Sequence, residues 1–459
     1  MTLTRTLGSL HQQKVSKSAT ALFNNLGIYR FCIAVTVLDF LDILNVLDRH
    51  TNNYEKYIYS AVILGLMFAY FLRWKRVDIS FAPIIFLFFF IFTGWAFVIK
   101  FLTLDLREGY VAAETMVFAI ALFIPPNSIV LDAHKIVKLL TYLFSVGTVF
   151  YLVETIVKPL DVLSSVVGLH EVMFTKSIIC VLALCLCILT GRQILALFVA
   201  VITAIALALR PTSTLVLALT CCLPIAFALK LRVSGFRPTA VLLSRTIAMG
   251  TLFLAAAIPL LLYFFFDDIA SMIYVAETYI KADLLGGHSN TDFRLAILRL
   301  SFDAIDRTSF WYGSALTGGV TVPLGMLPEW QGWWATGNVN GQAPIHSDFV
   351  IVFVLMGILG YILFALAFYL VLKNRFRELA RRDTRGSGVV LQAIAIIAVV
   401  ALLIYCSDEP YLAYYNHSNV VWLLLLISEV AMKSTIIDRS ERRYQTALSR
   451  ESLLNRPRG

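Results

Sequence analysis

About twelve apolar runs constrain the fold of this chain more than any other feature of its sequence. Most are long enough to cross the roughly 30 Å hydrocarbon core of a bilayer as a helix. In lipid, every backbone N–H and C=O group needs a partner inside the protein, and a helix supplies these partners by itself. The chain is also 59% hydrophobic and only 15% charged, a composition that soluble globular domains do not approach. We therefore predict an all-α, polytopic integral membrane protein with about 12 transmembrane helices.

The predicted spans divide the chain into five parts. Residues 1–27 form a cytoplasmic N-terminal segment, 28–266 carry helices 1–9, and 267–347 form one large extracytoplasmic loop. Residues 348–432 carry helices 10–12, and 433–459 form a basic cytoplasmic tail. The first segment has no short apolar core followed by a cleavage site, so the first span is expected to act as a signal-anchor. The spans are Ile28–Leu47, Tyr57–Leu72, Phe81–Ile99, Tyr110–Ile124, Ile136–Val157, Phe174–Thr190, Gln193–Leu209, Thr212–Leu229, Thr246–Phe266, Phe349–Leu372, Val389–Cys406 and Ser418–Met432.

Lysine and arginine are distributed unevenly between alternate loops. The side that includes both termini holds 27 of the 38 cationic residues, and the other side holds 11. Cytoplasmic loops carry the excess of Lys and Arg, so both termini are predicted to be cytoplasmic and the 267–347 loop extracytoplasmic. We assign the net charge of +9 to contacts with anionic lipids of the cytoplasmic leaflet, and we expect no nucleic-acid partner.

A turn with an arginine follows the seventh predicted span. Arg210 precedes Pro211, and a proline disfavours helix at the residue before it, so the chain is expected to turn there. Thr212 or Ser213 can then cap the next helix, whose first N–H groups would point outward beside the guanidinium. This pattern predicts an anion site. The alternative is an interfacial arginine that closes a tight hairpin.

Two arginines of the large loop have different surroundings in the sequence. Arg299 has Asp303 four residues later, so the two are predicted to pair along one helix face. Arg294 has no carboxylate at helical spacing. It is therefore predicted to bind an external anion, with a solvated loop arginine as the alternative.

His346 lies where the large loop returns to the membrane, and Ser347 and Asp348 follow it. Histidine exchanges protons near neutral pH, which makes it the first candidate for a general base. Asp348 and Ser347 are near enough in sequence to orient it. The alternative is that His346 caps the tenth predicted span.

Other polar and aromatic residues of the outer loops are candidates for contact with a substrate. The same contact is predicted for Thr212, Ser213, Arg299 and Asp348. His417 is a plausible neighbour of the base, because it follows Asp408 and Glu409 in the last outer loop. Trp311 and Tyr312 are suited to stacking on sugar rings, although aromatic residues also gather at membrane interfaces without a ligand. The seven cysteines lie in or beside apolar runs without paired spacing, so we predict neither a disulfide framework nor a metal site.

Three motifs occur in an order that resembles a known superfamily. The first is Arg210 with Thr212 and Ser213, and the second is Thr-Asp-Phe-Arg, which ends at Arg294 and is followed by Arg299. The third is Pro-Ile-His-Ser-Asp-Phe over 344–349, followed by Leu-Met-Gly-Ile-Leu-Gly over 355–360. Together with the predicted topology, these motifs resemble the bacterial O-antigen ligases and the O-antigen or exopolysaccharide polymerases. The likeness covers most of the chain in architecture and only these three places in motif.

The resemblance implies an integral membrane glycosyltransferase of the bacterial inner (cytoplasmic) membrane whose donor is a glycan linked to undecaprenyl diphosphate. Arg210 and Arg294 would stabilise the departing diphosphate, since guanidinium groups pair with phosphate oxygens. His346 would take the proton of the acceptor hydroxyl. The chain has no Asp-x-Asp motif, which favours a metal-independent reaction. Inversion at the sugar carbon is what the resemblance implies, and no cofactor is expected. The resemblance also leaves room for a chain-length regulator as a protein partner.

Three functions stay open at this point. We prefer a polymerase, whose acceptor is another lipid-linked repeat unit, over a ligase, whose acceptor is the lipid A-core. A flippase or other transporter is the alternative from a different class, and the intramembrane acids Asp39, Asp42 and Glu114 are the residues that favour it. Against a carrier stands the absence of a visible internal repeat between the two halves of the sequence.

Overall fold

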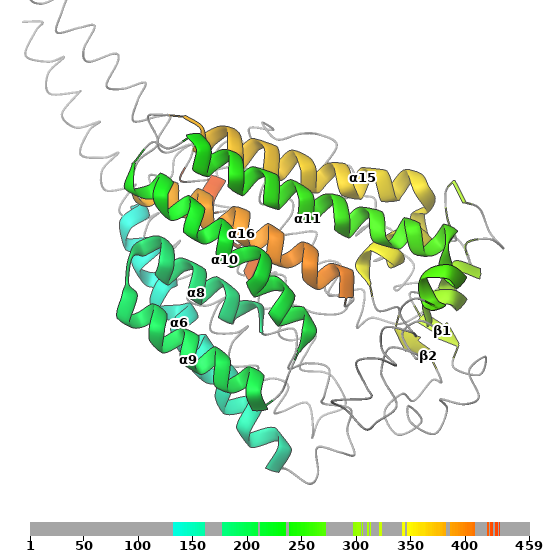
Figure 1. The fold of residues 1–459 in the computed structure, drawn as a ribbon, viewed down its shortest axis with the longest axis horizontal. Helices are drawn as coiled ribbons and strands as arrows, with labels where there is room; N and C mark the ends of the chain where they lie inside the picture. Colours follow the sequence, from blue (N-terminus) through cyan, green and yellow to red (C-terminus); the bar gives the residue numbers. More distant parts are fainter. Residues whose placement is uncertain are drawn as a thin grey trace, which may run out of the picture.

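The fold is known from a computed structural model, which describes chiefly the middle and the C-terminal third of the chain (Figure 1). The described residues are 132–160, 177–209, 212–235, 238–271, 297–303, 305, 310–311, 313, 321–323, 342–344, 347–381, 386–408, 420–421, 423–425, 427–429 and 431. The first four predicted spans, most of the predicted loop and both terminal segments lie outside these residues.

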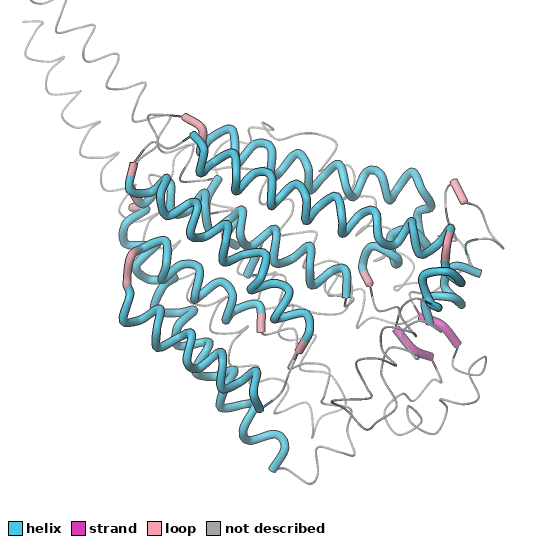
Figure 2. Tube along the Cα trace, viewed as in Figure 1, coloured by secondary structure: helices cyan, strands magenta, loops and turns pink. Residues whose placement is uncertain are grey.

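The described residues form a bundle of apolar helices that run along a common direction (Figures 1 and 2). Five of these helices are long and apolar enough to cross a membrane, and α8 and α9 are shorter apolar helices. The bounds are Ala133–Leu160 for α6, Ile178–Thr190 for α8, Gln193–Leu209 for α9, Ser213–Ser234 for α10, Pro238–Phe264 for α11, Asp348–Leu379 for α15 and Ser387–Asp408 for α16.

The predicted spans within the described residues are confirmed as helices, with shifts at some ends. The span predicted over Gln193–Leu209 matches α9 at both ends. In contrast, α11 begins at Pro238, eight residues before the predicted Thr246. Proline is favourable in the first turn of a helix, because its missing N–H would be unpaired there in any case. Arg245, predicted to lie in a cytoplasmic loop, therefore lies within a helix.

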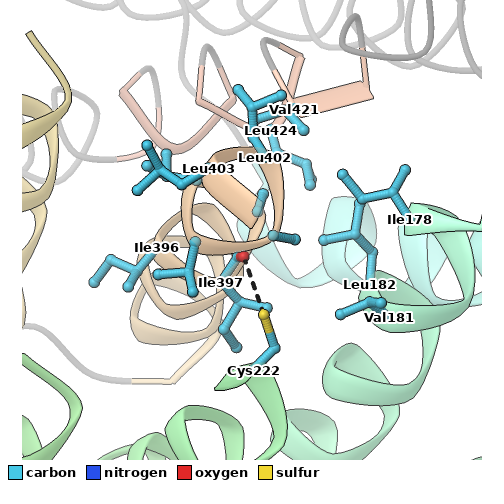
Figure 3. Packing of buried hydrophobic residues seen from close by; sticks show 14 of the residues in the cluster. Ile178, Val181, Leu182, Cys222, Ile396, Ile397, Leu402, Leu403, Val421 and Leu424 are labelled. Carbon is cyan, nitrogen blue, oxygen red and sulfur yellow. Dashed lines mark hydrogen bonds between the residues drawn. The ribbon is translucent and has the colours of Figure 1, made fainter. Parts of the chain in front are cut away.

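Helix α16 forms the centre of the bundle, and its apolar window is buried on all sides. It packs against α6, α8, α10, α11 and α15. Figure 3 shows Cys222 of α10 beside Ile397 of α16, and the Cys222 thiol lies 3.7 Å from the Ile397 carbonyl. The six described cysteines are free, and five of them are buried, as predicted for small core residues.

The outer helices expose large apolar side chains, in contrast to α16. On α9, Ile194 is 88% and Leu197 67% exposed, and on α11 Phe253 is 71% exposed. Exposure of this kind is unfavourable in water and favourable in hydrocarbon. The combination of an apolar outer surface with spans of sufficient length supports a membrane protein.

Cationic side chains hold the helix ends together at one end of the bundle. Arg232 of α10 donates to the carbonyls of Leu379 and Arg381 at 2.9 and 2.7 Å, just after α15 ends. Lys230 donates to the carbonyl of Leu189 at 3.3 Å, where Gly191 with φ 75° ends α8. Helix C-termini attract cations, because their last carbonyls carry partial negative charge. These residues belong to the loops that were predicted to share the cytoplasmic side.

Two short strands form the described extended structure. Strand β1, Thr321–Pro323, pairs with β2, Gln342–Pro344, in antiparallel register with Thr321 opposite Pro344. Both strands belong to the predicted 267–347 loop and lie at one end of the bundle (Figure 2). The all-α prediction is thus confirmed for the bundle and misses this strand pair. Strands this short give no alternating pattern that a sequence could reveal.

Candidate functional site

The end of the bundle opposite the cationic contacts gathers the N-termini of α10 and α15 and the C-terminus of α16. Helix α10 runs antiparallel to α16, because Cys222 contacts Ile397 in the middle of both helices while Arg232 reaches the far end. The hydroxyl of Ser347 donates to the carbonyl of Cys406 at 3.2 Å, which joins the start of α15 to the end of α16. The candidate site residues that the structure describes all lie at this end.

Thr212 occupies the N-cap position of α10, and it is one of the two residues predicted to cap this helix. Its backbone is extended, with φ −125° and ψ 119°, and Ser213 is the first helical residue. Thr212 is 7% exposed, yet its side chain makes no capping hydrogen bond, and its Oγ1 has no hydrogen-bond partner among the described residues. Buried hydroxyls are nearly always paired, so this one calls for an explanation. It lies at a helix N-terminus, where amide N–H groups favour an anion.

Ser347 caps α15, and this finding decides one prediction. The Ser347 hydroxyl accepts a hydrogen bond from the Val350 amide at 3.4 Å. The backbone of Ser347 is extended. The alternative that His346 caps this helix is therefore wrong, because the cap lies one residue later. His346 keeps its place in the sequence directly before a fixed helix start.

Asp348 follows the cap and is fully buried. It lies beside the Cys406 thiol, with which it forms a hydrogen bond. A carboxylate in the first turn of a helix is stabilised by the amide dipoles of that turn. Because it is buried against α16, Asp348 fits a role in fixing the start of α15 better than the predicted direct contact with a substrate.

Arg299 is held by residues that follow α11, not by the partner that the sequence suggested. Its guanidinium lies 2.9 Å from the carboxylate of Asp267 and 5.6 Å from the centre of the Phe266 ring. The prediction paired it with Asp303, which lies exposed on the same helical segment. Arg299 is 59% exposed, so its charge also faces solvent at this end.

Aromatic contacts join the loop helix 297–303 to the bundle. The Phe302 ring packs edge to face on Tyr263 of α11, with centroids 5.5 Å apart. Phe310 packs on Phe353 at 5.8 Å. Trp311 packs edge to face on Phe310 and is 60% exposed, so the predicted stacking on a sugar stays a prediction. The loop is thus attached to the end of the bundle that carries Thr212 and Ser347.

Several predicted residues lie outside the described part of the chain. These are Arg210, Arg294, Tyr312, His346 and His417. The same holds for Asp39, Asp42 and Glu114, and the side chain of Glu154 in α6 is not described either. The roles of these residues stay predictions. Within the described ranges, no group of three or more His, Cys, Asp or Glu residues is placed to hold a metal ion.

A buried ion pair at the other end of the bundle was missed by the sequence reasoning. Arg375 lies 3.0 Å from the carboxylate of Glu429, and both side chains are 2% exposed. Arg375 also donates to Gln392 at 3.2 Å, and Gln392 donates to the carbonyl of Ser428 at 2.7 Å. Arg375 and Arg232 were both predicted to be loop cations. This prediction is wrong, because each lies in a helix and is only 2% exposed. Glu429 and Gln392 inside apolar runs were the signals that could have revealed the network.

No protein-family model and no curated protein matches this chain.

Proposed function

We propose that this protein is a membrane glycosyltransferase that polymerises oligosaccharide repeat units linked to undecaprenyl diphosphate. The products would be surface polysaccharides such as O-antigen, capsule or exopolysaccharide, made on the extracytoplasmic face of a bacterial inner membrane. The observation that carries the proposal is the buried hydroxyl of Thr212 at the N-terminus of α10, which has no partner among the described residues. Thr212 follows Arg210 by two residues and lies at the same end of the bundle as the start of α15.

The diphosphate is the group that this helix end is suited to receive. The N-terminus of this 22-residue helix carries a partial positive charge that favours an anion, and the Thr212 hydroxyl can donate one hydrogen bond to it. Arg210 precedes this turn, and Arg294 precedes the helical segment 297–303 that is attached to the same end. Arginine keeps its charge and pairs with two phosphate oxygens at once, which stabilises a leaving diphosphate.

The reaction needs one proton acceptor and forms one bond. The acceptor hydroxyl gives its proton to His346 while its oxygen attacks the anomeric carbon of the donor glycan. The bond between that carbon and the diphosphate oxygen breaks, and undecaprenyl diphosphate leaves with its electron pair. Ser347 and Asp348 support this role by fixing the helix start that follows His346.

Glycan analysis of a strain that lacks the gene tests the proposal. A polymerase defect leaves single repeat units on the cell surface, and this is the result we expect. Long polymer stranded on undecaprenyl diphosphate would instead identify a ligase that transfers glycan to the lipid A-core. Repeat units that face the cytoplasm would identify a flippase and overturn the assignment as a transferase.

A further inference from the structure

Helix α15 consists of two helical parts that meet at Gly357. This residue has φ 62° and ψ −166°, a backbone conformation inside the helix that is not helical. That region of conformational space is essentially restricted to glycine, because a Cβ atom would clash with the backbone. The chain therefore reverses between a short helical part, residues 348–356, and the membrane span Met356–Leu379. The tenth span had been predicted to run through this point without interruption.

A second glycine makes the reversal sterically possible. A Cβ atom at Gly360 would lie 2.1 Å from the Cβ atom of Met356, far closer than two carbon atoms can approach. The Met356 Cβ is attached to the backbone and cannot move away on its own. Gly357 and Gly360 thus have separate tasks: Gly357 provides the backbone angle, and Gly360 provides the space. Both belong to the Leu-Met-Gly-Ile-Leu-Gly motif.

The reversal is bonded to the large loop. The amides of Ile358 and Leu359 donate to the carbonyls of Phe310 and Trp311 at 2.9 and 3.4 Å. Amides in the first turn of a helix have no partner within the helix, so the loop supplies acceptors that the span itself lacks. Phe310 also packs on Phe353 of the short part.

The short part is held at its other end and along its sides. Ser347 and Asp348 fix its start on the end of α16. The side chains from Phe349 to Val354 are all at most 3% exposed. A rigid helical part therefore connects the residue after His346 with the reversal and the loop.

We infer that Gly357 is a positioning residue: its reversal attaches α15 to Phe310 and Trp311 of the large loop and turns the short part back, so that the start of α15, directly after the proposed base His346, is held on the end of α16. The geometric part of this inference stands by itself, and its catalytic part rests on the proposed function. With any other residue at 357, α15 would extend as one continuous helix. The loop carbonyls would then lose their amide partners, and the start of α15 would leave the end of α16.

A cross-linking experiment on the full-length protein in its native membrane tests the geometric part. Cysteines replace Trp311 and Leu359, whose backbones are hydrogen-bonded and whose side chains are 60% and 54% exposed. Copper phenanthroline should close a disulfide between them, detected by mass spectrometry of the linked peptides. The matched control pair places the second cysteine at Ile362, which is equally exposed at 54% but lies three residues further along the span. Equal linking of both pairs would overturn the reversal.

The Gly357→Ala substitution in the 311–359 cysteine pair tests the cause. The link should be lost, whereas Gly386→Ala should leave it intact. Gly386 has a similar φ of 60° but lies before α16 at the opposite end of the bundle, so it controls for backbone strain alone. A link that persists with alanine at 357 would contradict the inference.

The catalytic part is tested with protein that carries only its native cysteines. The substrate is repeat units linked to undecaprenyl diphosphate, which are extracted from a strain that lacks the gene. Gly357→Ala should lower kcat about a hundredfold, the effect of misplacing a reacting group by about 1 Å, with KM for the donor little changed. Gly250→Ala, in open space on α11, should retain full activity. Full transfer by Gly357→Ala would overturn the positioning role. Absence of transfer by the wild type would instead refute the proposed function and leave the cross-link result to decide the geometry.

Discussion

Ser347 changes how the residue before it is interpreted. From the sequence alone, His346 could act as a base or as the cap of the following helix, since both roles occur at such a position. The Ser347 hydroxyl accepts from the Val350 amide and donates to the Cys406 carbonyl, so the capping role is filled. This leaves acid–base chemistry as the predicted role of His346.

The substitutions His346→Ala and His346→Asn should therefore both abolish transfer. Loss of a general base costs about a hundredfold to ten-thousandfold in rate, and Asn cannot take up a proton at neutral pH. Protein abundance and thermal stability in detergent should be unchanged. Ser347→Ala is the matched control, and it should cost about 1 kcal/mol of folding free energy as a lost cap. An active His346→Asn enzyme would remove His346 from the mechanism, and His417 would be tested next.

Removal of the Thr212 hydroxyl distinguishes an effect on stability from an effect on transfer. Its Oγ1 is buried without a hydrogen-bond partner among the described residues, so Thr212→Val should change the free energy of unfolding by less than about 1 kcal/mol. If the hydroxyl donates to the donor diphosphate, transfer should fall about tenfold or more, the loss of one hydrogen bond to a charged group. Thr141→Val is the control, because that buried hydroxyl bonds to the Val137 carbonyl within α6. Full activity of Thr212→Val would show that the reaction does not use this hydroxyl.

Residue-scale prediction succeeded where the chemistry is local. The capping position after Pro211 follows from the preferences of threonine and proline, and the structure places Thr212 there. The partner of Arg299 could not be found in this way. The nearest acid along its own helix was Asp303, but Asp267 reaches Arg299 from another element, 32 residues away in sequence. Contacts between elements depend on packing that a single sequence does not display.

At the scale of elements, hydrophobic length predicted the helices well and their interruptions poorly. The apolar run over Gln193–Leu209 predicted both ends of α9, since a run that must cross lipid has to be helical. The reversal at Gly357 lies in a run that is apolar on both sides, so no change in pattern marks it. Its two glycines were visible, but glycine is common in membrane helices for packing reasons as well.

The pair of Arg375 and Glu429 joins α15 to the helical residues near the C-terminus. Glu429→Ala should lower stability by about 3–5 kcal/mol, because it leaves a buried guanidinium without its carboxylate. Replacing both residues with leucine should recover most of this loss, since an apolar pair needs no charge compensation. The measurement is thermal unfolding of the purified protein in detergent.

The control for this prediction is Lys135→Ala, which breaks the exposed pair with Asp132. Lys135 is 71% exposed, so the change should cost less than about 1 kcal/mol. A loss of less than about 1 kcal/mol for Glu429→Ala would contradict the view that this pair fastens α15 to the C-terminal helical residues.

At the scale of the whole molecule, the charge asymmetry and the helix arrangement agree. Arg232 and Lys230, which belong to the side with the excess of Lys and Arg, hold the helix termini at one end of the described bundle. The strand pair and the loop helix lie at the other end. That agreement arises because the alternation of spans is a topological property, which a sequence does display.

Reporter fusions test the orientation of the bundle. A fusion after Trp334 should register outside the cytoplasm, and a fusion after Arg382 should register inside it. Alkaline phosphatase and a fluorescent protein that matures only in the cytoplasm give opposite signals at the two positions. Reversed signals would place the candidate site on the cytoplasmic face and contradict the proposed function.

The most direct test of the account is the release of undecaprenyl diphosphate by the purified protein in liposomes supplied with lipid-linked repeat units. We predict one undecaprenyl diphosphate for each glycosidic bond formed, without added metal or nucleotide sugar. Arg210→Ala and Arg294→Ala should release almost none, and lysine at either position should restore only part of the rate, because a point charge cannot replace a bidentate fork. Movement of the lipid-linked units across the bilayer without release of undecaprenyl diphosphate would identify a transporter and contradict the account.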